Sequence, residues 1–211
     1  MGRILLIILG IGAALVALLA IAGVSTYNSL VGLQQGVDAQ WAQVQNVYQR
    51  RADLIPNLVN TVSGAANFEK STLAEVTSAR ASVGRVQLPA GAAPTDPAQF
   101  ADFEKAQGQL SSALSRLLVV VERYPELTAT AGFRDLQAQL EGTENRISVE
   151  RGRFNEAVKA YNTAIRRFPA VLIAGLFGHQ ARPYFTATTG AETPPKVEFN
   201  FGQQPAPVAK P

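Results

Sequence analysis

A seven-residue repeat of apolar side chains constrains the fold of this chain more than any other feature of the sequence. Two interleaved series run from residue 27 to residue 65. The first comprises Tyr27, Gln34, Trp41, Tyr48, Ile55 and Val62, and the second Leu30, Val37, Val44, Arg51, Leu58 and Ala65. Such a stripe is typical of a helix that buries one face against other helices. The repeat keeps its phase across Pro56, which predicts one kinked helix over 25–66 rather than a chain reversal.

The apolar stripe of this helix carries a charged residue near its centre. Arg51 occupies a core position, and Arg50, Asp53 and Asn57 lie close to it in the sequence. A buried charge without a partner is costly, so we expect a carboxylate from another helix to meet Arg51.

The last long helix, predicted over 129–168, has a similar polar interruption. Its apolar repeat consists of Phe133, Leu140, Ile147, Phe154, Tyr161 and Phe168, and the neighbouring core series of Gln137, Glu144, Arg151, Val158 and Ile165. The polar residues of both helices lie near the helix centres, so we expect a shared central polar layer. Its predicted members are Arg50, Arg51, Asp53, Asn57, Glu144, Asn145 and Arg151.

This layer has two interpretations. A buried polar network sets the register of packed helices, which is the interpretation we favour. The alternative is a site for a ligand or a partner. A closed, fully paired layer would favour the structural role, and an open concavity would favour the binding site.

Residues 1–24 are predicted to anchor the chain in a membrane. The run Ile4–Val24 contains no charged side chain and would be roughly 30 Å long as a helix, enough to cross the hydrocarbon core. The alternative is a signal peptide cleaved near Ala20-Ile21-Ala22, for which the apolar run is long. The small residues of the run would allow self-association in lipid or simply form part of the span; they are Gly10, Gly12, Ala13, Ala14 and Ala17. Arg3 predicts, by the positive-inside rule, a cytoplasmic N-terminus with the bulk of the chain outside the cytoplasm.

The remaining segments complete the predicted organisation. We expect a second helix over 68–84, a loop over 84–97, and a third helix that begins at Asp96-Pro97 and ends at Tyr124-Pro125. The apolar stretch 170–177 is expected to pack on the bundle or on the membrane surface. The domains are therefore an anchor over 1–24, a helical bundle over 25–185, and a Pro-rich, unstructured tail over 186–211.

The sequence contains no recognisable catalytic or metal-binding constellation. It has no cysteine, and its one histidine, His179, is expected to be a solvated loop residue. We find no Glu-x-x-His pair, phosphate-binding glycine loop or His-Glu-x-x-His motif, and therefore predict no cofactor, no metal and no enzymatic activity. The net charge of +3 is scattered along the chain, which argues against binding of nucleic acid.

Several motifs resemble the bacterial LemA family over roughly residues 1–185. They are Tyr27-Asn28-x-Leu30-Val31, Trp41-x-x-Val44, Arg50-Arg51-x-Asp53-Leu54-Ile55-Pro56-Asn57-Leu58-Val59, Arg116-Leu117-Leu118, Glu122-x-Tyr124-Pro125, Thr143-Glu144-Asn145-Arg146-Ile147 and Tyr161-Asn162-x-x-Ile165-x-x-Phe168-Pro169. The resemblance implies one N-terminal transmembrane helix and an antiparallel four-helix bundle with long first and last helices. It also implies an N-terminus outside the cell, opposite to the orientation that Arg3 predicts.

These features favour a membrane-tethered, non-enzymatic scaffold or adaptor in the bacterial inner membrane. Its expected partners are membrane lipid through residues 4–24, other membrane or envelope proteins, and further copies of itself as a homo-oligomer. The first alternative is a ligand-sensing or accessory subunit that uses the central polar layer. The weakest is a carboxylate-based enzyme.

Overall fold

The computed structural model describes residues 2–65, 68–86, 88 and 91–186, and this part of the chain is helical with no strand. The helices are α1 (Gly2–Ser63), α2 (Lys70–Arg85), α3 (Pro97–Val121), α4 (Pro125–Thr128), α5 (Ala131–Ala164) and α6 (Ala170–Leu176). The predicted all-α class with a long apolar N-terminal helix is confirmed. Residues 187–211, most of the predicted tail, lie outside the described residues.

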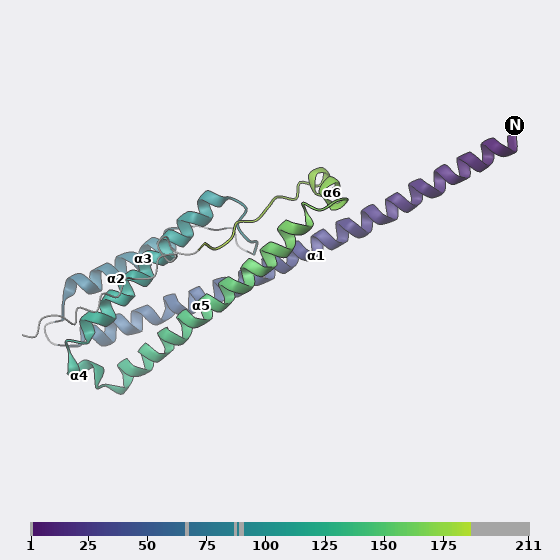
Figure 1. Ribbon diagram of the computed structural model, residues 1–211. Coiled ribbons are helices and arrows are strands. Elements are labelled where there is room, and N and C mark those ends of the chain that lie inside the picture. The colour runs from purple at the N-terminus through teal and green to yellow at the C-terminus, as the bar shows by residue number, and fades with distance from the viewer. Residues whose placement is uncertain (1, 66–67, 87, 89–90, 187–211) are drawn as a thin grey trace, which may run out of the picture.

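The four long helices pack as two pairs. The second half of α1 lies along α5, α2 lies along α3, and the short α6 packs against α1 (Figure 1). Successive long helices reverse direction, so the end of α5 returns toward the middle of α1 (Figure 1). The first half of α1 projects away from the other helices.

Helix α1 joins the predicted anchor to the bundle without a break. Its first turns, over residues 4–22, are exposed on every side, and α1 is the single helix in the described part of the chain that is long and apolar enough to cross a membrane. From Leu30 onward one face becomes buried, following the predicted stripe. The buried residues of this face are Leu30, Val37, Trp41, Val44, Tyr48, Arg51, Leu54, Ile55, Leu58 and Val62.

Pro56 lies inside α1, as the unbroken phase of the repeat predicts. Proline has no N–H, so the carbonyl oxygen of Ala52 loses its helical hydrogen bond. Arg80 of α2 replaces this bond, because its Nε lies 3.2 Å from the Ala52 oxygen and donates to it.

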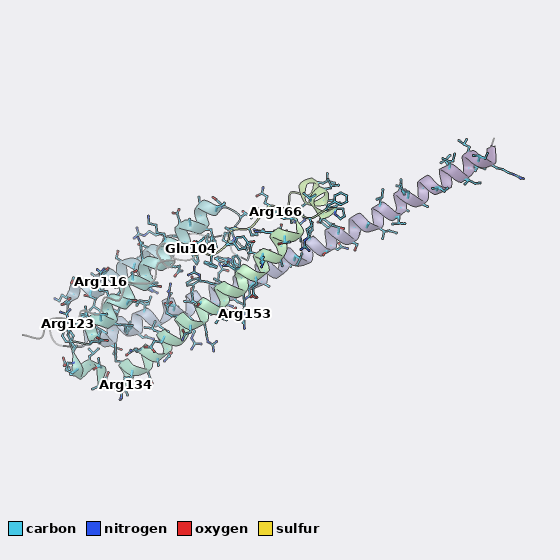
Figure 2. All side chains as sticks on the ribbon, viewed as in Figure 1. Glu104, Arg116, Arg123, Arg134, Arg153 and Arg166 are labelled. Atoms are coloured by element: carbon cyan, nitrogen blue, oxygen red, sulfur yellow. The ribbon has the colours of Figure 1, made fainter. Side chains whose placement is uncertain are left out.

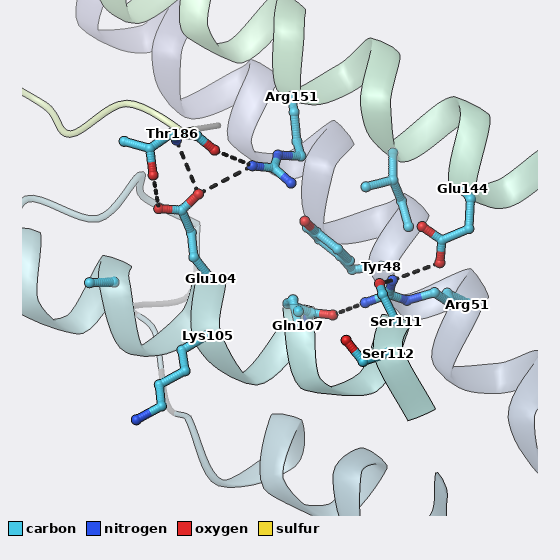
Figure 3. A pocket seen from close by; sticks show the side chains of 13 residues that line it. Tyr48, Arg51, Glu104, Lys105, Gln107, Ser111, Ser112, Glu144, Arg151 and Thr186 are labelled. Carbon is cyan, nitrogen blue, oxygen red and sulfur yellow. Dashed lines mark hydrogen bonds and ion pairs between the residues drawn. The ribbon is translucent and has the colours of Figure 1, made fainter. Parts of the chain in front are cut away.

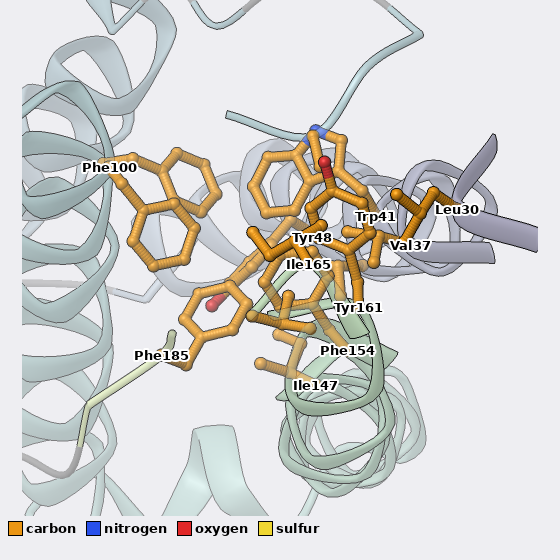
Figure 4. Close-up of a cluster of buried hydrophobic side chains, with 14 of the residues drawn as sticks. Leu30, Val37, Trp41, Tyr48, Phe100, Ile147, Phe154, Tyr161, Ile165 and Phe185 are labelled. Carbon is orange, nitrogen blue, oxygen red and sulfur yellow. The ribbon is translucent and has the colours of Figure 1, made fainter. Parts of the chain in front are cut away.

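Buried apolar side chains form two clusters, one on each side of Arg51. The cluster nearer the anchor is centred on Trp41, whose ring lies against those of Phe100, Phe103, Phe154 and Phe185 (Figure 4). The second cluster fills the far end of the molecule. It comprises Leu54, Ile55, Leu58, Val62, Phe68, Val76, Leu110, Ala113, Leu114, Leu117, Val120, Val121, Leu127, Phe133 and Leu140. Arg51 therefore occupies the boundary between two apolar cores.

Most helix boundaries fall close to their predicted places. Asp96 caps α3 as expected, with Oδ1 accepting from the Ala98 N–H at 2.9 Å. Helix α3, however, ends at Val121, and Pro125 opens the additional short helix α4 rather than only ending its predecessor. This agrees with the preference of proline for the first turn of a helix.

Candidate functional site

The guanidinium group of Arg51 connects three helices. Arg51 is 1% exposed; its Nη1 donates to Glu144 Oε1 of α5 at 2.7 Å and to Ser111 Oγ of α3 at 2.8 Å. Its Nη2 donates to Gln107 Oε1 of α3, and the group lies 5.1 Å from the centre of the Tyr48 ring (Figure 3). The expected carboxylate partner of Arg51 is therefore present and is Glu144.

The α3 partners were missed at the sequence level, although one signal was available. Phe103, Gln107, Leu110 and Leu114 follow the spacing of one buried helical face, and all four are buried. A glutamine inside such a stripe indicates a polar contact within the core, in the same way that Arg51 does.

Arg151 does not join Arg51 and Glu144, contrary to the prediction. Its Nη2 instead donates to Glu104 Oε1 of α3 at 3.2 Å and to the Thr186 carbonyl oxygen at 3.1 Å, and its guanidinium lies 4.5 Å from the centre of the Phe185 ring. The single predicted layer is therefore two neighbouring clusters, one around Arg51 and one around Arg151 (Figure 3).

Four other predicted members of the layer lie at the surface. Arg50, Asp53 and Asn57 are exposed because they lie outside the face of α1 that buries Arg51, Leu54 and Leu58. Asp53 accepts a hydrogen bond from its own helix, from Gln49 Nε2 at 2.8 Å. Asn145 is likewise exposed. Proximity in sequence to a core charge therefore did not bring these side chains into the core.

An open pocket of about 530 Å³ separates the two polar clusters. Tyr48, Arg51, Ala101, Glu104, Lys105, Gln107, Gly108, Ser111, Ser112, Glu144, Ile147, Arg151 and Thr186 line it. The α3 wall consists largely of small side chains, which leave the space between α3 and α5 unfilled. Its volume falls within the range of small-molecule sites, about 300–1,000 Å³. Three cationic and two anionic side chains face this space, so it is suited to polar or zwitterionic groups.

Burial raises the pKa of the Tyr48 hydroxyl above its ordinary value of 10.0, with Arg151 and Arg51 opposing the rise and Glu144 and Glu104 adding to it. The hydroxyl is therefore protonated at neutral pH and is available as a hydrogen-bond donor. Among the described residues no group of three or more His, Cys, Asp or Glu side chains could hold a metal ion. The pocket offers hydrogen-bonding groups and charges of both signs.

Two asparagines of α5 hold the chain that follows α6. Asn162 exchanges two hydrogen bonds with the backbone of Arg182, both at 2.9 Å, and Asn155 does the same with Phe185, also at 2.9 Å. Asn155 and Asn162 are seven residues apart on the helix, a rise of about 10.5 Å. Arg182 and Phe185 are three residues apart in an extended chain, about 10 Å, so the two spacings match. We call Asn155 and Asn162 the asparagine clamp. It places Phe185 in the Trp41 cluster and Thr186 at the pocket.

His179 also differs from the prediction of a solvated residue. Its Nδ1 lies 3.2 Å from the Tyr161 hydroxyl, and its backbone N–H donates to the Ala174 carbonyl oxygen at 2.9 Å. The imidazole therefore packs where α1, α5 and α6 meet.

The fold defines a class: all-helical proteins with a long N-terminal helix that is apolar enough to cross a membrane. The family can be identified within this class, because the model of the LemA family matches residues 40–199. The chain therefore belongs to the LemA family. The magnetosome protein MamQ of Magnetospirillum gryphiswaldense is 26% identical to the chain over 183 residues, covering 80% of this chain and 67% of MamQ. The magnetosome proteins MamQ 1 and MamQ 2 of Paramagnetospirillum magneticum show the same identity and coverage.

Proposed function

We propose that this chain is a membrane-tethered, non-enzymatic adaptor that holds a partner protein at the bacterial inner membrane. The observation that carries the proposal is the continuity of α1 from the apolar run into the core of the bundle. An unbroken helix transmits the position of the membrane to the bundle without a flexible joint. A partner bound on the bundle is therefore held at a set height above the lipid.

The pocket between α1, α3 and α5 is the place where we expect the adaptor to contact its partner. Glu104, Lys105 and Ser112 supply charged and hydroxyl groups at this opening. Because Arg51 and Arg151 already have partners inside the protein, the pocket persists without a ligand and does not depend on binding to form.

The proposed topology is a single span with the bulk of the chain outside the cytoplasm, following Arg3 and the positive-inside rule. Self-association is part of the proposal. Gly10 and Gly12 are open to contact, since no atom lies within 4 Å of a Cβ built at either position. Small residues of this kind permit close approach of helices in lipid.

A photocrosslinking residue at Ser112, with Val149 as the matched position, tests the adaptor proposal in native membranes. Ser112 lies at the pocket, whereas Val149 is an exposed α5 residue outside it. We expect Ser112 to yield a crosslinked species with the mass of this chain plus a second protein, and Val149 to yield little. Equal yields from both positions would contradict a partner site at the pocket, and a species of twice the chain mass from both would indicate self-association alone.

A second candidate function is the sensing of a small polar ligand, and the open form of the pocket favours it. A central layer sealed by its own ion pairs would have argued for a purely structural role. The pairs are present, but a space of about 530 Å³ stays open beside them. Tyr48, Gln107 and Ser111 supply neutral hydrogen-bonding groups at its base.

Gly108→Leu separates the two candidates. A Cβ built at Gly108 meets no atom within 4 Å, and Gly108 lines the pocket, so we expect a leucine at this position to occupy part of the pocket and to favour the helical state of α3 by up to about 1 kcal/mol. Gly142→Leu on α5, also in open space, is the control. If a small ligand binds here, native mass spectrometry should find it on the parent chain and on Gly142→Leu but not on Gly108→Leu. Absence of any bound small molecule from all three would exclude the sensor.

A further inference from the structure

Large exposed apolar side chains gather at one place outside the span. Eight of them follow residue 24 in the described chain, and five fall within 168–177: Phe168, Val171, Leu172, Leu176 and Phe177. Phe168 is 81% exposed, Leu176 77% and Leu172 64%. We call these five residues the α6 patch.

Helix α6 is apolar on both of its sides. Ala174 is buried and Ile173 packs against the Trp41 cluster, so one side faces the protein. Leu172 and Leu176 lie one turn apart on the other side of α6, and no described residue covers them. Phe168 is exposed two residues before the helix begins. A contiguous apolar patch of this kind marks a surface that another apolar phase covers.

The α6 patch lies where the span of α1 ends. The Ile173 Cδ1 atom lies 3.8 Å from a Cβ built at Gly23, and the rings of Tyr27 and Phe177 are 4.6 Å apart between centres. The apolar run ends at Val24. If that run crosses the hydrocarbon core, α6 lies at the level of the lipid headgroups, where tyrosine and other aromatic rings are favoured.

The charge of this region also fits a lipid surface. Arg166 and Arg167 are exposed at the end of α5 beside α6, and Figure 2 shows Arg166 at this end of the molecule. There is no Asp or Glu between residues 157 and 186, and none before Asp38 in α1. Exposed arginines beside an apolar helix attract anionic headgroups. Neither Arg166 nor Arg167 forms an ion pair with another described residue.

We propose that α6 is an interfacial membrane element: the α6 patch inserts into the outer edge of the bilayer that α1 crosses, with Arg166 and Arg167 on anionic headgroups. The inference rests on the membrane span of the proposed function. It adds a second attachment of the same chain to the same membrane. Two attachments fix the tilt of the bundle relative to the membrane. A single span would leave the bundle free to tilt and to rotate about the membrane normal.

The absence of cysteine from the sequence makes this inference testable in the full chain. Single cysteines at Leu172 and Leu176 receive a nitroxide label, and the protein is reconstituted in vesicles of phosphatidylcholine with phosphatidylglycerol. Power saturation compares the accessibility of each label to oxygen, which concentrates in lipid, and to a water-soluble nickel chelate. Leu15 in the span and Val119, an exposed apolar residue of α3 far from α6, are the reference positions.

Labels at 172 and 176 should resemble Leu15, with more oxygen and less nickel access than Val119. Exchange of Arg166 and Arg167 for glutamine should raise their nickel access by a few-fold, while circular dichroism shows the fold unchanged. Labels at 172 and 176 that behave like Val119, while Leu15 reports lipid, would overturn the interfacial element and leave the span intact. Leu15 reporting water would overturn both. Low access to both reagents with dipolar broadening between labels would instead assign the patch to a second copy.

Discussion

Arg80 of α2 donates a hydrogen bond to the one carbonyl oxygen of α1 that Pro56 leaves without its helical partner, that of Ala52, at 3.2 Å. The loss of the hydrogen bond and its replacement therefore come from different helices. Arg80 thus ties α2 to α1 through an exposed hydrogen bond.

Arg80→Met should destabilise the fold by about 0.5–1.5 kcal/mol, because one hydrogen bond is lost while the aliphatic stem is kept. The loss should be smaller in a Pro56→Ala background, since that substitution restores the backbone N–H that bonds the Ala52 carbonyl oxygen. Pro56→Ala alone should straighten or stabilise α1 without unfolding the bundle. The free energy of unfolding should change by at most a few kcal/mol. Chemical denaturation followed by circular dichroism measures all three, with Arg85→Met on the same helix as control. Equal losses in both backgrounds would show that Arg80 acts independently of Pro56.

Arg51 and Glu144 should be energetically coupled. Arg51 is buried and Glu144 is 42% exposed, so the pair is less costly to break than a fully buried one. We expect each of Arg51→Met and Glu144→Leu to cost about 1–3 kcal/mol, and the double variant to cost clearly less than their sum. The coupling should exceed the roughly 0–1 kcal/mol of an exposed pair such as Arg116 and Glu75. Additive losses would mean that Gln107 and Ser111 alone satisfy Arg51.

The asparagine clamp should control the order of residues 181–186. Asn155→Ala and Asn162→Ala each remove two hydrogen bonds to the backbone and should each cost about 1–3 kcal/mol. Amide exchange of Arg182 and Phe185 should accelerate at least tenfold. Asn145→Ala, a change at an exposed asparagine of the same helix, is the control. Unchanged exchange in both clamp variants would show that Phe185 in the aromatic cluster holds the segment by itself.

The free energy of unfolding should fall at alkaline pH because Tyr48 loses its phenol proton. Burial raises the pKa of Tyr48 above its ordinary value of 10.0, so the folded state holds the phenol proton more tightly than the unfolded chain. The resulting stabilisation is fully present below pH 10.0 and is lost as the pH rises through the raised folded value.

Denaturation curves measured from about pH 9 upward follow this loss of stability, and Tyr48→Phe should make the loss shallower. Part of the loss should remain, because burial also raises the pKa of Tyr161. Tyr184→Phe controls for removal of a hydroxyl at an exposed position. If Tyr48→Phe loses stability at alkaline pH as steeply as the parent chain does, Tyr48 is not the group responsible for the loss.

The elements of this fold could be predicted because each depends on local spacing. The repeat from Tyr27 to Val62 identifies one helix and its buried face, and its kept phase across Pro56 places the proline inside that helix. Asp96-Pro97 marks the start of α3 through a local contact, because the Asp96 carboxylate accepts its hydrogen bond from Ala98, only two residues along the chain. A core position for Arg51 follows from the same repeat, together with the need for a carboxylate partner.

What the tertiary structure alone decided is which side chains of different helices meet. Helical phase separates a buried face from an exposed one, but it does not say how far one helix is shifted or turned against the next. Arg151 therefore pairs with Glu104 rather than Glu144, and Gln107 and Ser111 complete the contacts of Arg51. The Phe185 ring reaches the Trp41 cluster because Asn155 and Asn162 of α5 bind the backbone of the extended segment that carries it. Such contacts join residues far apart in sequence, and no local pattern encodes the distance between them.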